Sequence, residues 1–578
     1  MRGKHGELSS NELIASITYG KKVVIWGTGA AYSEISSFVL DNCEVSYFID
    51  NNPLKWAEQV NDCPIYSSNI LKEEIKEELI VFIASTATDE IVRQLEQLNI
   101  TKKQYVTFNE LRRIKRELRM EELNSEIIFN KKEYYDNLMQ AFSEIRYREI
   151  IFSYVLNSEF CSLIDYLCSP EVERYLYYPP NRLEYKLCGQ GKMLFSNLLP
   201  GRQDYFQLMK ASASLINQAN ISFLVKREED ISAYYEEQQL LTFENRASHA
   251  YLSSNDETMQ SLVKQMKLPV NEEEISWLCS WMNFYKNYID FMYDFLQKQD
   301  FKMNISVNEV FGYQNVITQI MNELQRDTIT MQHSITAQAE QLTEHLNKHP
   351  MTDFTHYYLL AKHHIVWGQK YKEIMEGYGV PSEQIIILGN PKYNYDAKIK
   401  RTFYRTREIN SFCVFLSYPA YNNFNVNMQL INIAEKIAND FNLNYYIRKH
   451  PTDFKSYPIN SLSHCLGEIA HDKTIIELLD LIDFSFVSAS TTFLESIYHY
   501  VPAFAYESED TPLFSDYFAL DSKFVFSNEL EANEVVSQLI ASQMETVNDL
   551  NQVSNSYIIT DHNLPAVKYK NFYSRYTT

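Results

Sequence analysis

Short apolar segments alternate with helical stretches towards both ends of this chain of 578 residues. Near the amino terminus we expect strands over 22–26, 45–49, 79–84 and 105–108, with helices between them. A second series of the same kind covers about residues 355–560. Alternation of strands and helices is typical of parallel, doubly wound sheets. The sequence therefore predicts an α/β protein whose ligands bind at the carboxyl ends of strands.

The middle of the chain has a different spacing of apolar residues. Apolar residues recur every three or four positions over 133–156 and 275–298, which favours helices. Strands over 303–307 and 328–331 return the chain to the α/β pattern. The strands expected in the second series are 364–367, 384–388, 413–416, 444–447, 484–487 and 503–506.

These three patterns of expected strands and helices predict three domains. Residues 1–115 form a Rossmann-like module of the nucleotide-binding type. Residues 116–350 form a helix-rich first half, and residues 351–578 a second half, of a pair of Rossmann-like folds that face each other across a cleft.

Charge and composition exclude several classes of protein. The net charge is -22, from 53 Lys and Arg against 75 Asp and Glu, which disfavours binding to nucleic acid or to an anionic membrane surface. No run of 18 apolar residues predicts a spanning helix, and the first twenty residues lack the apolar core of a signal peptide. The eight cysteines include no CxxC pair, so we expect reduced thiols in the cytoplasm and no metal site.

Two short segments carry the clearest chemistry. Residues 448–451 read Arg-Lys-His-Pro at the end of an expected strand, and residues 488–492 read Ser-Ala-Ser-Thr-Thr at the end of another. Hydroxyls and backbone N–H groups at a strand-to-helix turn bind phosphate, and a histidine donates to a phosphate oxygen or moves a proton. We therefore predict an anion site from Arg448, His450, Ser490 and Thr491.

A third segment approximates a dinucleotide fingerprint. Gly27 and Gly29 would let the turn approach a phosphate, and Asp50 closes the next strand, where it could bind ribose hydroxyls. Tyr32 stands where the third glycine is usual, so the alternative is a Rossmann-like fold with no bound dinucleotide.

Four further residues follow expected strands or begin helices. Glu309 and His333 are candidates for a general base, against the alternatives of a surface carboxylate and a histidine bonded to backbone. Gly389 suits a tight loop on a cleft or a simple turn. Glu495 lies one helical turn after the hydroxyl cluster and could bind a sugar hydroxyl or remain an exposed carboxylate.

The order of five segments resembles one broad family. QHS, HIVWGQKYKEIMEGYGV, IIILGNPKYN, IRKHPTDF and VSASTTFLESIYHYVPAFAY are similar to the GT-B fold transferases that build bacterial capsules, teichoic acids and other surface glycans. That group includes capsule Kdo transferases, sialyl- and polysialyltransferases and the CDP-polyol phosphotransferases. The first domain, with VVIWGTGAAYSEI, VSYFIDNNPLKW and LIVFIAS, resembles a small Rossmann-like module fused to bacterial sugar-modifying enzymes.

The resemblance implies roles for matching residues. His450 would contact the donor phosphate, as would Ser490 and Thr491, and His333 would match the histidine of a Gln-His-Gly motif that is a candidate base. Ser334 stands where glycine is usual in that motif.

The implied function is a glycosyltransferase that needs no cofactor or metal and inverts the transferred centre. Its donor would be a sugar linked to CMP, CDP or UDP, and its acceptor a hydroxyl of a glycan or lipid-linked glycan. Peripheral association with the inner face of the plasma membrane, through the acceptor, is compatible with a cytoplasmic protein. Two alternatives stay open: a CDP-polyol phosphotransferase of the teichoic-acid type, and a non-catalytic component that binds nucleotide sugars. The sequence leaves the oligomeric state open.

Overall fold

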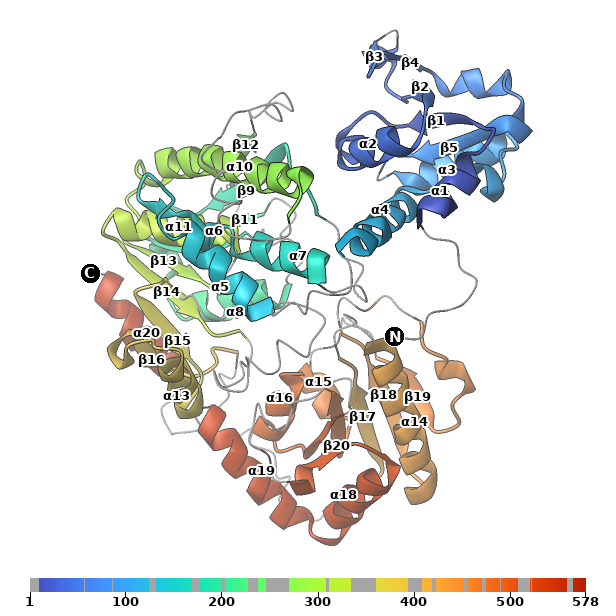
Figure 1. Ribbon diagram of the computed structural model, residues 1–578. Helices are drawn as coiled ribbons and strands as arrows, with labels where there is room; N and C mark the ends of the chain where they lie inside the picture. The colour runs from blue at the N-terminus through green and yellow to red at the C-terminus, as the bar shows by residue number, and fades with distance from the viewer. Residues whose placement is uncertain are drawn as a thin grey trace. The chain divides into compact units, whose positions relative to one another are not determined.

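The computed structural model describes most of the chain (Figure 1). The described residues are 10–56, 58–85, 87–123, 131–168, 176–198, 203–226, 238–245, 270–307, 311–333, 360–392, 408–417, 423–450, 453, 456–469, 473, 475–488, 490–507, 520, 522–558 and 565–577.

The described residues form two compact units. The first consists of Met1–Tyr134, Ser162–Pro180 and His249–Trp281, and the second of Tyr135–Cys161, Asn181–Ser248 and Met282–Thr578. The domain limit at residue 115 stays a prediction. The limit at residue 350 does not separate the two later sheets, because the strands His363–Val366 and Ile385–Ile387 belong to the same sheet as Met303–Ser306 and Asp327–Met331.

The first unit is built on a six-stranded sheet of order β3-β4-β2-β1-β5-β6, in which all pairs but β3–β4 are parallel. Its strands are β1 (Lys22–Trp26), β2 (Val45–Ile49), β3 (Gln59–Val60), β4 (Cys63–Tyr66), β5 (Leu79–Ile83) and β6 (Tyr105–Val106). Its main helices are α1 (Ser10–Thr18), α2 (Ala30–Asn42), α3 (Thr88–Gln97) and α4 (Phe108–Leu123). Separate apolar clusters lie on the two faces of this sheet, one with α1, α2 and α4 and the other with α3. The module is therefore doubly wound, as the alternation predicts.

The second unit begins with an eight-stranded sheet of order β12-β9-β11-β10-β13-β14-β15-β16. The strands from β11 to β16 are parallel, and β9 and β12 add an antiparallel edge. The strands are β9 (Arg182–Cys188), β10 (Met193–Asn197), β11 (Ile221–Lys226), β12 (Gln238–Glu244), β13 (Met303–Ser306), β14 (Asp327–Met331), β15 (His363–Val366) and β16 (Ile385–Ile387).

Several helices precede, connect or follow the strands of this sheet in the chain. They are α5 (Lys131–Phe142), α6 (Phe152–Val155), α7 (Asn157–Cys168), α8 (Gln203–Ala213), α10 (Glu272–Leu296), α11 (Gly312–Glu323), α13 (Gln369–Gly377) and, from the end of the chain, α20 (Pro565–Thr577). We call the sheet and these helices the first half; the residues of α5 up to Tyr134, of α7 from Ser162 and of α10 up to Trp281 belong to the first unit.

The second half contains a six-stranded, wholly parallel sheet of order β19-β18-β17-β20-β21-β22. Its strands are β17 (Ser411–Phe415), β18 (Asn444–Arg448), β19 (Cys465–Glu468), β20 (Phe484–Ser488), β21 (Ala503–Tyr506) and β22 (Val525–Phe526). Its helices are α14 (Asn423–Phe441), α15 (Ile475–Leu479), α16 (Thr492–Tyr498), α18 (Glu529–Ala541) and α19 (Gln543–Tyr557). Two Rossmann-like halves in series are the hallmark of the GT-B fold, and this chain has that fold after its amino-terminal module.

Two expectations about the middle region are wrong in part. The helix expected over 133–156 is interrupted by a hairpin of β7 (Arg146–Tyr147) and β8 (Ile150–Ile151). Arg148 and Glu149 have φ of 49° and 63°, so they form the two-residue turn that ends helical geometry there. The first half is also less helical than expected, because β9 to β12 lie in the stretch where helices were predicted.

Candidate functional site

The strand order of the second half sets the position of a ligand site. Numbered along the chain, its strands run 3-2-1-4-5-6, so the order reverses between β17 and β20. Ligands of open α/β sheets bind outside the carboxyl ends of the strands at such a switch point. Ser417 follows β17, and Ser488 ends β20. His450 follows β18, the other neighbour of β17, so three strand ends supply polar groups here.

The turn from β20 to α16 gathers hydroxyl groups. Ser490 Oγ accepts a hydrogen bond from the Thr492 N–H at 3.2 Å and lies 2.9 Å from Thr492 Oγ1. Thr491 is the N-cap residue of α16. Ser488 is fully buried, and its Oγ has no hydrogen-bond partner. The sequence singled out Ser490 and Thr491, whereas the structure pairs Ser490 with Thr492 and adds Ser488.

The side chains of the basic segment Arg448–His450, at the end of β18, have different partners. Arg448 is 9% exposed and donates to the carbonyl oxygens of Ile469 at 3.3 Å and Lys473 at 3.0 Å. Its guanidinium therefore holds the chain that leaves β19. Lys449 forms an ion pair with Glu468 at 3.2 Å. His450 is half-buried at the strand end, and its carbonyl oxygen accepts from the Asp453 N–H at 2.9 Å.

Glu495 lies in the first turn of α16 and is half-buried. Its backbone N–H bonds the Thr491 carbonyl at 3.2 Å, so the residue belongs to the helix that the hydroxyl cluster begins. Its role towards a sugar hydroxyl stays a prediction.

Gly389 lies in the first half, in the turn after β16, with φ of 88°. Its carbonyl oxygen accepts a hydrogen bond from the Tyr569 hydroxyl at 3.1 Å, and its N–H bonds the Val366 carbonyl at 3.3 Å. The turn is thus fixed between β15 and α20, and a donor contact by Gly389 stays a prediction.

Unpartnered polar groups also collect at the strand ends of the first half. Its parallel order reverses between β10 and β13, where Ser196 lies in register with Ser306, and Ser306 with Thr330. The Asn197 Nδ2, Ser306 Oγ and Thr330 Oγ1 atoms are buried without a hydrogen-bond partner. These donors and acceptors lie at the strand ends without a protein partner among the described residues, where they can bond an oxygen of a ligand or of water. None of these residues was singled out in the sequence; the alternation of polar with apolar residues in these strands is the only signal.

His333, two residues after β14, is held in one orientation. Its Nδ1 lies 3.1 Å from the carbonyl oxygen of Val307, and its ring lies 4.4 Å from the ring of Tyr205. A carbonyl oxygen only accepts, so Nδ1 carries the proton in this bond and the neutral ring has its lone pair on Nε2. That tautomer suits a general base. The other candidate base, Glu309, lies outside the described residues, as does Ser334.

The glycine turn of the amino-terminal module is shaped by its own sheet. Gly27 has φ of +117°, and a Cβ there would lie 2.3 Å from the Ala84 carbonyl oxygen, so only glycine fits between β1 and β5. A Cβ on Gly29 would meet nothing within 4 Å. Tyr32 packs edge-on against Phe48 in the core, at 5.0 Å between ring centroids. Close packing against Ala84 therefore accounts for a glycine at position 27 without a bound phosphate.

Asp50 of this module already has partners. Its carboxylate accepts from Thr28 Oγ1, from the Asn52 N–H at 2.9 Å and from Lys55 Nζ at 3.0 Å. Burial would raise the pKa of Asp50, but these hydrogen bonds outweigh it and lower the pKa below its usual value. A ribose would have to share this carboxylate, and binding of a dinucleotide stays a prediction.

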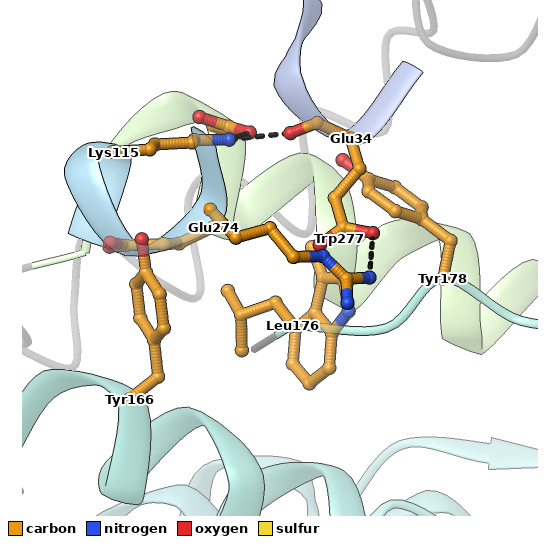
Figure 2. A pocket seen from close by; sticks show the side chains of 9 residues that line it. Glu34, Lys115, Tyr166, Leu176, Tyr178, Glu274 and Trp277 are labelled. Atoms are coloured by element: carbon orange, nitrogen blue, oxygen red, sulfur yellow. Dashed lines mark hydrogen bonds and ion pairs between the residues drawn. The ribbon is translucent and has the colours of Figure 1, made fainter. Parts of the chain in front are cut away.

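A charged recess lies elsewhere in the first unit (Figure 2). Arg112 pairs with Glu34, and Lys115 donates to the Glu34 carbonyl oxygen at 2.7 Å and pairs with Glu273. Burial raises the pKa of Glu34, which the Arg112 contact opposes. Each of these charges has an opposite charge beside it, so the recess has the character of a joint between helices rather than of an anion site.

No group of three or more His, Cys, Asp or Glu side chains among the described residues could hold a metal ion. No helix in the described part of the chain is long and apolar enough to cross a membrane.

Comparison with known proteins matches the module and the fold separately. A family model described as C2185-like, N-terminal, matches residues 19–106. Among solved structures, S. aureus MnaA with UDP is 10% identical with a TM-score of 0.40, covering 67% of this chain and 98% of that one. The UDP-GlcNAc 2-epimerase from Neisseria meningitidis bound to UDP-GlcNAc is 10% identical, with a TM-score of 0.39 and coverage of 66% and 98%.

A third solved structure, the glycotransferase of kitacinnamycin, is 9% identical, with a TM-score of 0.38 and coverage of 67% and 99%. Among curated proteins, none matches this sequence. Identities and TM-scores this low carry no argument about chemistry, which rests on the residues of this chain.

Proposed function

We propose that this protein is a glycosyltransferase that moves a sugar from a nucleotide-activated donor to a hydroxyl of a growing cell-surface glycan. One observation carries the proposal. In each Rossmann-like half, hydroxyl, amide or imidazole groups collect at the carboxyl ends of the strands beside the switch point.

The second half would bind the donor phosphate. Ser490 and Thr492 present paired hydroxyls after β20, and His450 follows β18. The α16 helix has only seven residues, so these side chains and the local N–H groups, rather than a long helix, would meet the charge. Negative charge grows on the phosphate as the sugar leaves, and donors fixed in advance stabilise it most in the transition state.

The first half would activate the acceptor. His333 has the tautomer that accepts a proton at Nε2, because Val307 holds Nδ1. In the proposed reaction the acceptor oxygen attacks the anomeric carbon, its proton passes to His333, and the bond to the nucleotide phosphate breaks with its electron pair on the phosphate. A single displacement of this kind inverts the anomeric centre.

The test uses purified full-length protein with CMP, CDP, UDP and GDP in a thermal-shift assay. Binding at roughly 100 times the dissociation constant stabilises a protein by about 2.7 kcal/mol, which is readily seen. We expect a cytidine or uridine nucleotide to raise the Tm of wild type, and His450→Ala to lose most of that shift. His464→Ala is the matched control. That histidine is also half-buried in the second half and bonds a backbone carbonyl at 3.1 Å, but it precedes β19 at the amino ends of the strands.

A second assay separates catalysis from binding. His333→Gln is expected to keep the nucleotide shift and to lower donor turnover by 10²-fold to 10⁴-fold, the range typical of a general base. A variant that turns over donor like wild type contradicts the base role. No shift with any nucleotide in wild type contradicts the proposal as a whole.

Polyol-phosphate transfer is the second candidate, because the His333 tautomer serves attack on phosphorus equally well. The leaving group distinguishes the two reactions. Transfer of a polyol phosphate from a CDP-polyol releases CMP, whereas transfer of a sugar from a CDP-sugar releases CDP. Each donor is therefore supplied alone, and the released nucleotide is identified by chromatography. CMP from a CDP-polyol indicates polyol-phosphate transfer, whereas CDP from a CDP-sugar, CMP from a CMP-sugar or UDP from a UDP-sugar indicates sugar transfer. A protein that binds nucleotide and releases none from any of these donors is the non-catalytic component.

A further inference from the structure

A chain of buried polar groups joins the end of β17 to the loop after β18. The N–H and Oγ of Ser417 each donate to Asn427 Oδ1 at 3.1 Å. Asn427 Nδ2 donates to the Tyr457 hydroxyl at 3.0 Å, and that hydroxyl donates to Asp453 Oδ2 at 2.7 Å. We call these four residues the polar bridge.

Burial of the four polar side chains of the bridge costs desolvation free energy, which a positioning role would explain. Ser417, Asn427, Asp453 and Tyr457 are 2%, 0%, 4% and 9% exposed. They adjoin the apolar core of the second half, and the ring of Tyr457 stacks on Phe424 at 5.3 Å. Apolar side chains of similar volume would stabilise such a place at least as well. A fully satisfied polar network instead fixes one geometry.

The direction of the hydrogen bonds is also fixed. Burial and the bond to the Asp453 carboxylate raise the pKa of the Tyr457 phenol above its usual value. The phenol therefore stays protonated, and it always donates towards Asp453 while accepting from Asn427.

The bridge ends at Asp453, which also contacts His450. The Asp453 N–H donates to the His450 carbonyl oxygen at 2.9 Å. At the other end, Ser417 follows β17, the strand beside the switch point. Thus the side chain of Asp453 is tied to β17 while its backbone is tied to His450.

We infer that the polar bridge is a positioning device that holds Asp453, and through its backbone bond His450, against the end of β17 and so sets where a donor phosphate lies. None of its members needs to touch the ligand. This inference rests on the proposed function for its ligand, a nucleoside diphosphate, while the positioning itself is measurable without any ligand.

The matched variants are Tyr457→Phe and Tyr445→Phe. Both remove a buried phenol that donates to a carboxylate in the second half, since the Tyr445 hydroxyl donates to Glu435 Oε2 at 3.0 Å. Tyr445 is the second residue of β18, near its amino end, whereas His450 follows the carboxyl end of that strand. A purely structural loss should thus affect the two variants alike.

The first measurement is amide hydrogen exchange of the ligand-free protein. We expect Tyr457→Phe to raise exchange in the peptide that covers 449–457 by about tenfold, the factor for one lost hydrogen bond, and Tyr445→Phe to leave it unchanged. Asp453→Ala should reproduce the effect, and Asp453→Asn, which keeps an acceptor oxygen, should reverse most of it. Unchanged exchange in Tyr457→Phe and Asp453→Ala overturns the inference, whatever the protein binds.

The second measurement is calorimetric titration with UDP and CDP, each against its nucleoside. We expect Tyr457→Phe to weaken the diphosphate about tenfold and the nucleoside less than about twofold, because only the phosphate meets His450. Equal weakening of both ligands overturns the inference. If wild type binds no nucleotide while exchange rises as expected, the proposed function fails and the positioning stands.

Discussion

Glu159 is a buried carboxyl group whose ionisation links stability to pH. It lies in the first turn of α7, 6% exposed, and accepts from the Tyr285 hydroxyl at 3.1 Å and from Ser158 Oγ at 2.9 Å. Burial raises its pKa to about 7, against the partial compensation of these hydrogen bonds. The folded state therefore keeps a proton that the unfolded chain loses at lower pH.

We predict that Glu159→Gln reduces the loss of stability as pH rises. Between pH 4.5, the usual value, and about 7 the unfolded state binds fewer protons than the folded state, so the free energy of unfolding falls with rising pH. The full effect is about 3 kcal/mol at one pKa unit per 1.36 kcal/mol. Glutamine keeps an acceptor for Tyr285 and cannot ionise. The difference in Tm between variant and wild type should be small at pH 5 and largest at pH 8.

The control for that prediction is Glu96→Gln, an exposed position on α3. Its Tm difference from wild type should stay constant over the same pH range. A Glu159→Gln difference that is equally constant would contradict the raised pKa.

The candidate site shows which of its residues could be predicted from the sequence and which could not. His450 and Ser490 could be found because each follows an apolar strand in a short motif. Tyr457 and Asn427 could not, because they are 30 positions apart and meet only through the fold. The motif indicates that Arg448 carries a charge in the site. It does not indicate that the guanidinium donates to the backbone carbonyls of Ile469 and Lys473, which belong to a later segment.

At the scale of elements, α11 starts at a place with no room for a side chain. A Cβ on Gly312 would lie 2.1 Å from the Tyr285 hydroxyl and 2.4 Å from the Val155 carbonyl oxygen. The tyrosine ring could move, but the carbonyl belongs to the α6 backbone. The first turn of α11 is thereby packed directly on α6 and α10.

We predict that Gly312→Ala destabilises the first half by roughly 1–3 kcal/mol, the usual cost of overpacking. Gly377→Ala is the matched control, since it also lies in a helix and its Cβ would meet nothing within 4 Å. It should be neutral or gain up to about 1 kcal/mol from helix propensity. Urea unfolding of both variants measures the difference, and equal midpoints would contradict the close packing.

The elements differ in how far sequence alone defines them. The strands β1 and β2 agree with expectation to the residue, because each is a mostly apolar segment bounded by glycine or polar residues. The β7–β8 hairpin was missed, since its two-residue strands are too short to change the helical period around them. Strand β9 was missed although Arg182–Leu187 alternates polar and apolar residues, with the apolar ones buried, which is the period of a strand.

At the scale of the whole molecule, the last helix of the chain packs on the sheet of the first half. Figure 1 shows α20 beside β15 and β16, and its residues Tyr569, Phe572 and Tyr573 belong to the apolar core of that sheet. On the way, α19 packs on α16 and α13, and Tyr557 lies against Gly368. No local pattern tells which sheet a helix joins, so the sequence placed this helix with the second half.

This connection predicts that a substitution near the carboxyl terminus unfolds the first half. Tyr573 is 1% exposed, lies 6.4 Å from the ring of Phe195 and shares a 2.9 Å hydrogen bond with Ser212. Tyr573→Ala should cost roughly 3–5 kcal/mol as a cavity, and Tyr573→Phe about 1 kcal/mol as a lost hydrogen bond. Lys570→Ala, on the exposed face of the same helix, should cost nothing measurable.

Tryptophan emission can locate the effect. Trp367 lies just after β15 and is 4% exposed, and none of the five tryptophans of the chain lies between residues 408 and 578. Subtracting the signal of a Trp367→Phe background isolates unfolding of the first half. We expect Tyr573→Ala to shift this isolated transition to lower urea, because removal of the ring opens the core that β10 and α20 share. If the transition stays in place while ellipticity is lost at lower urea, α20 stabilises the second half instead and its assignment to the first sheet is wrong.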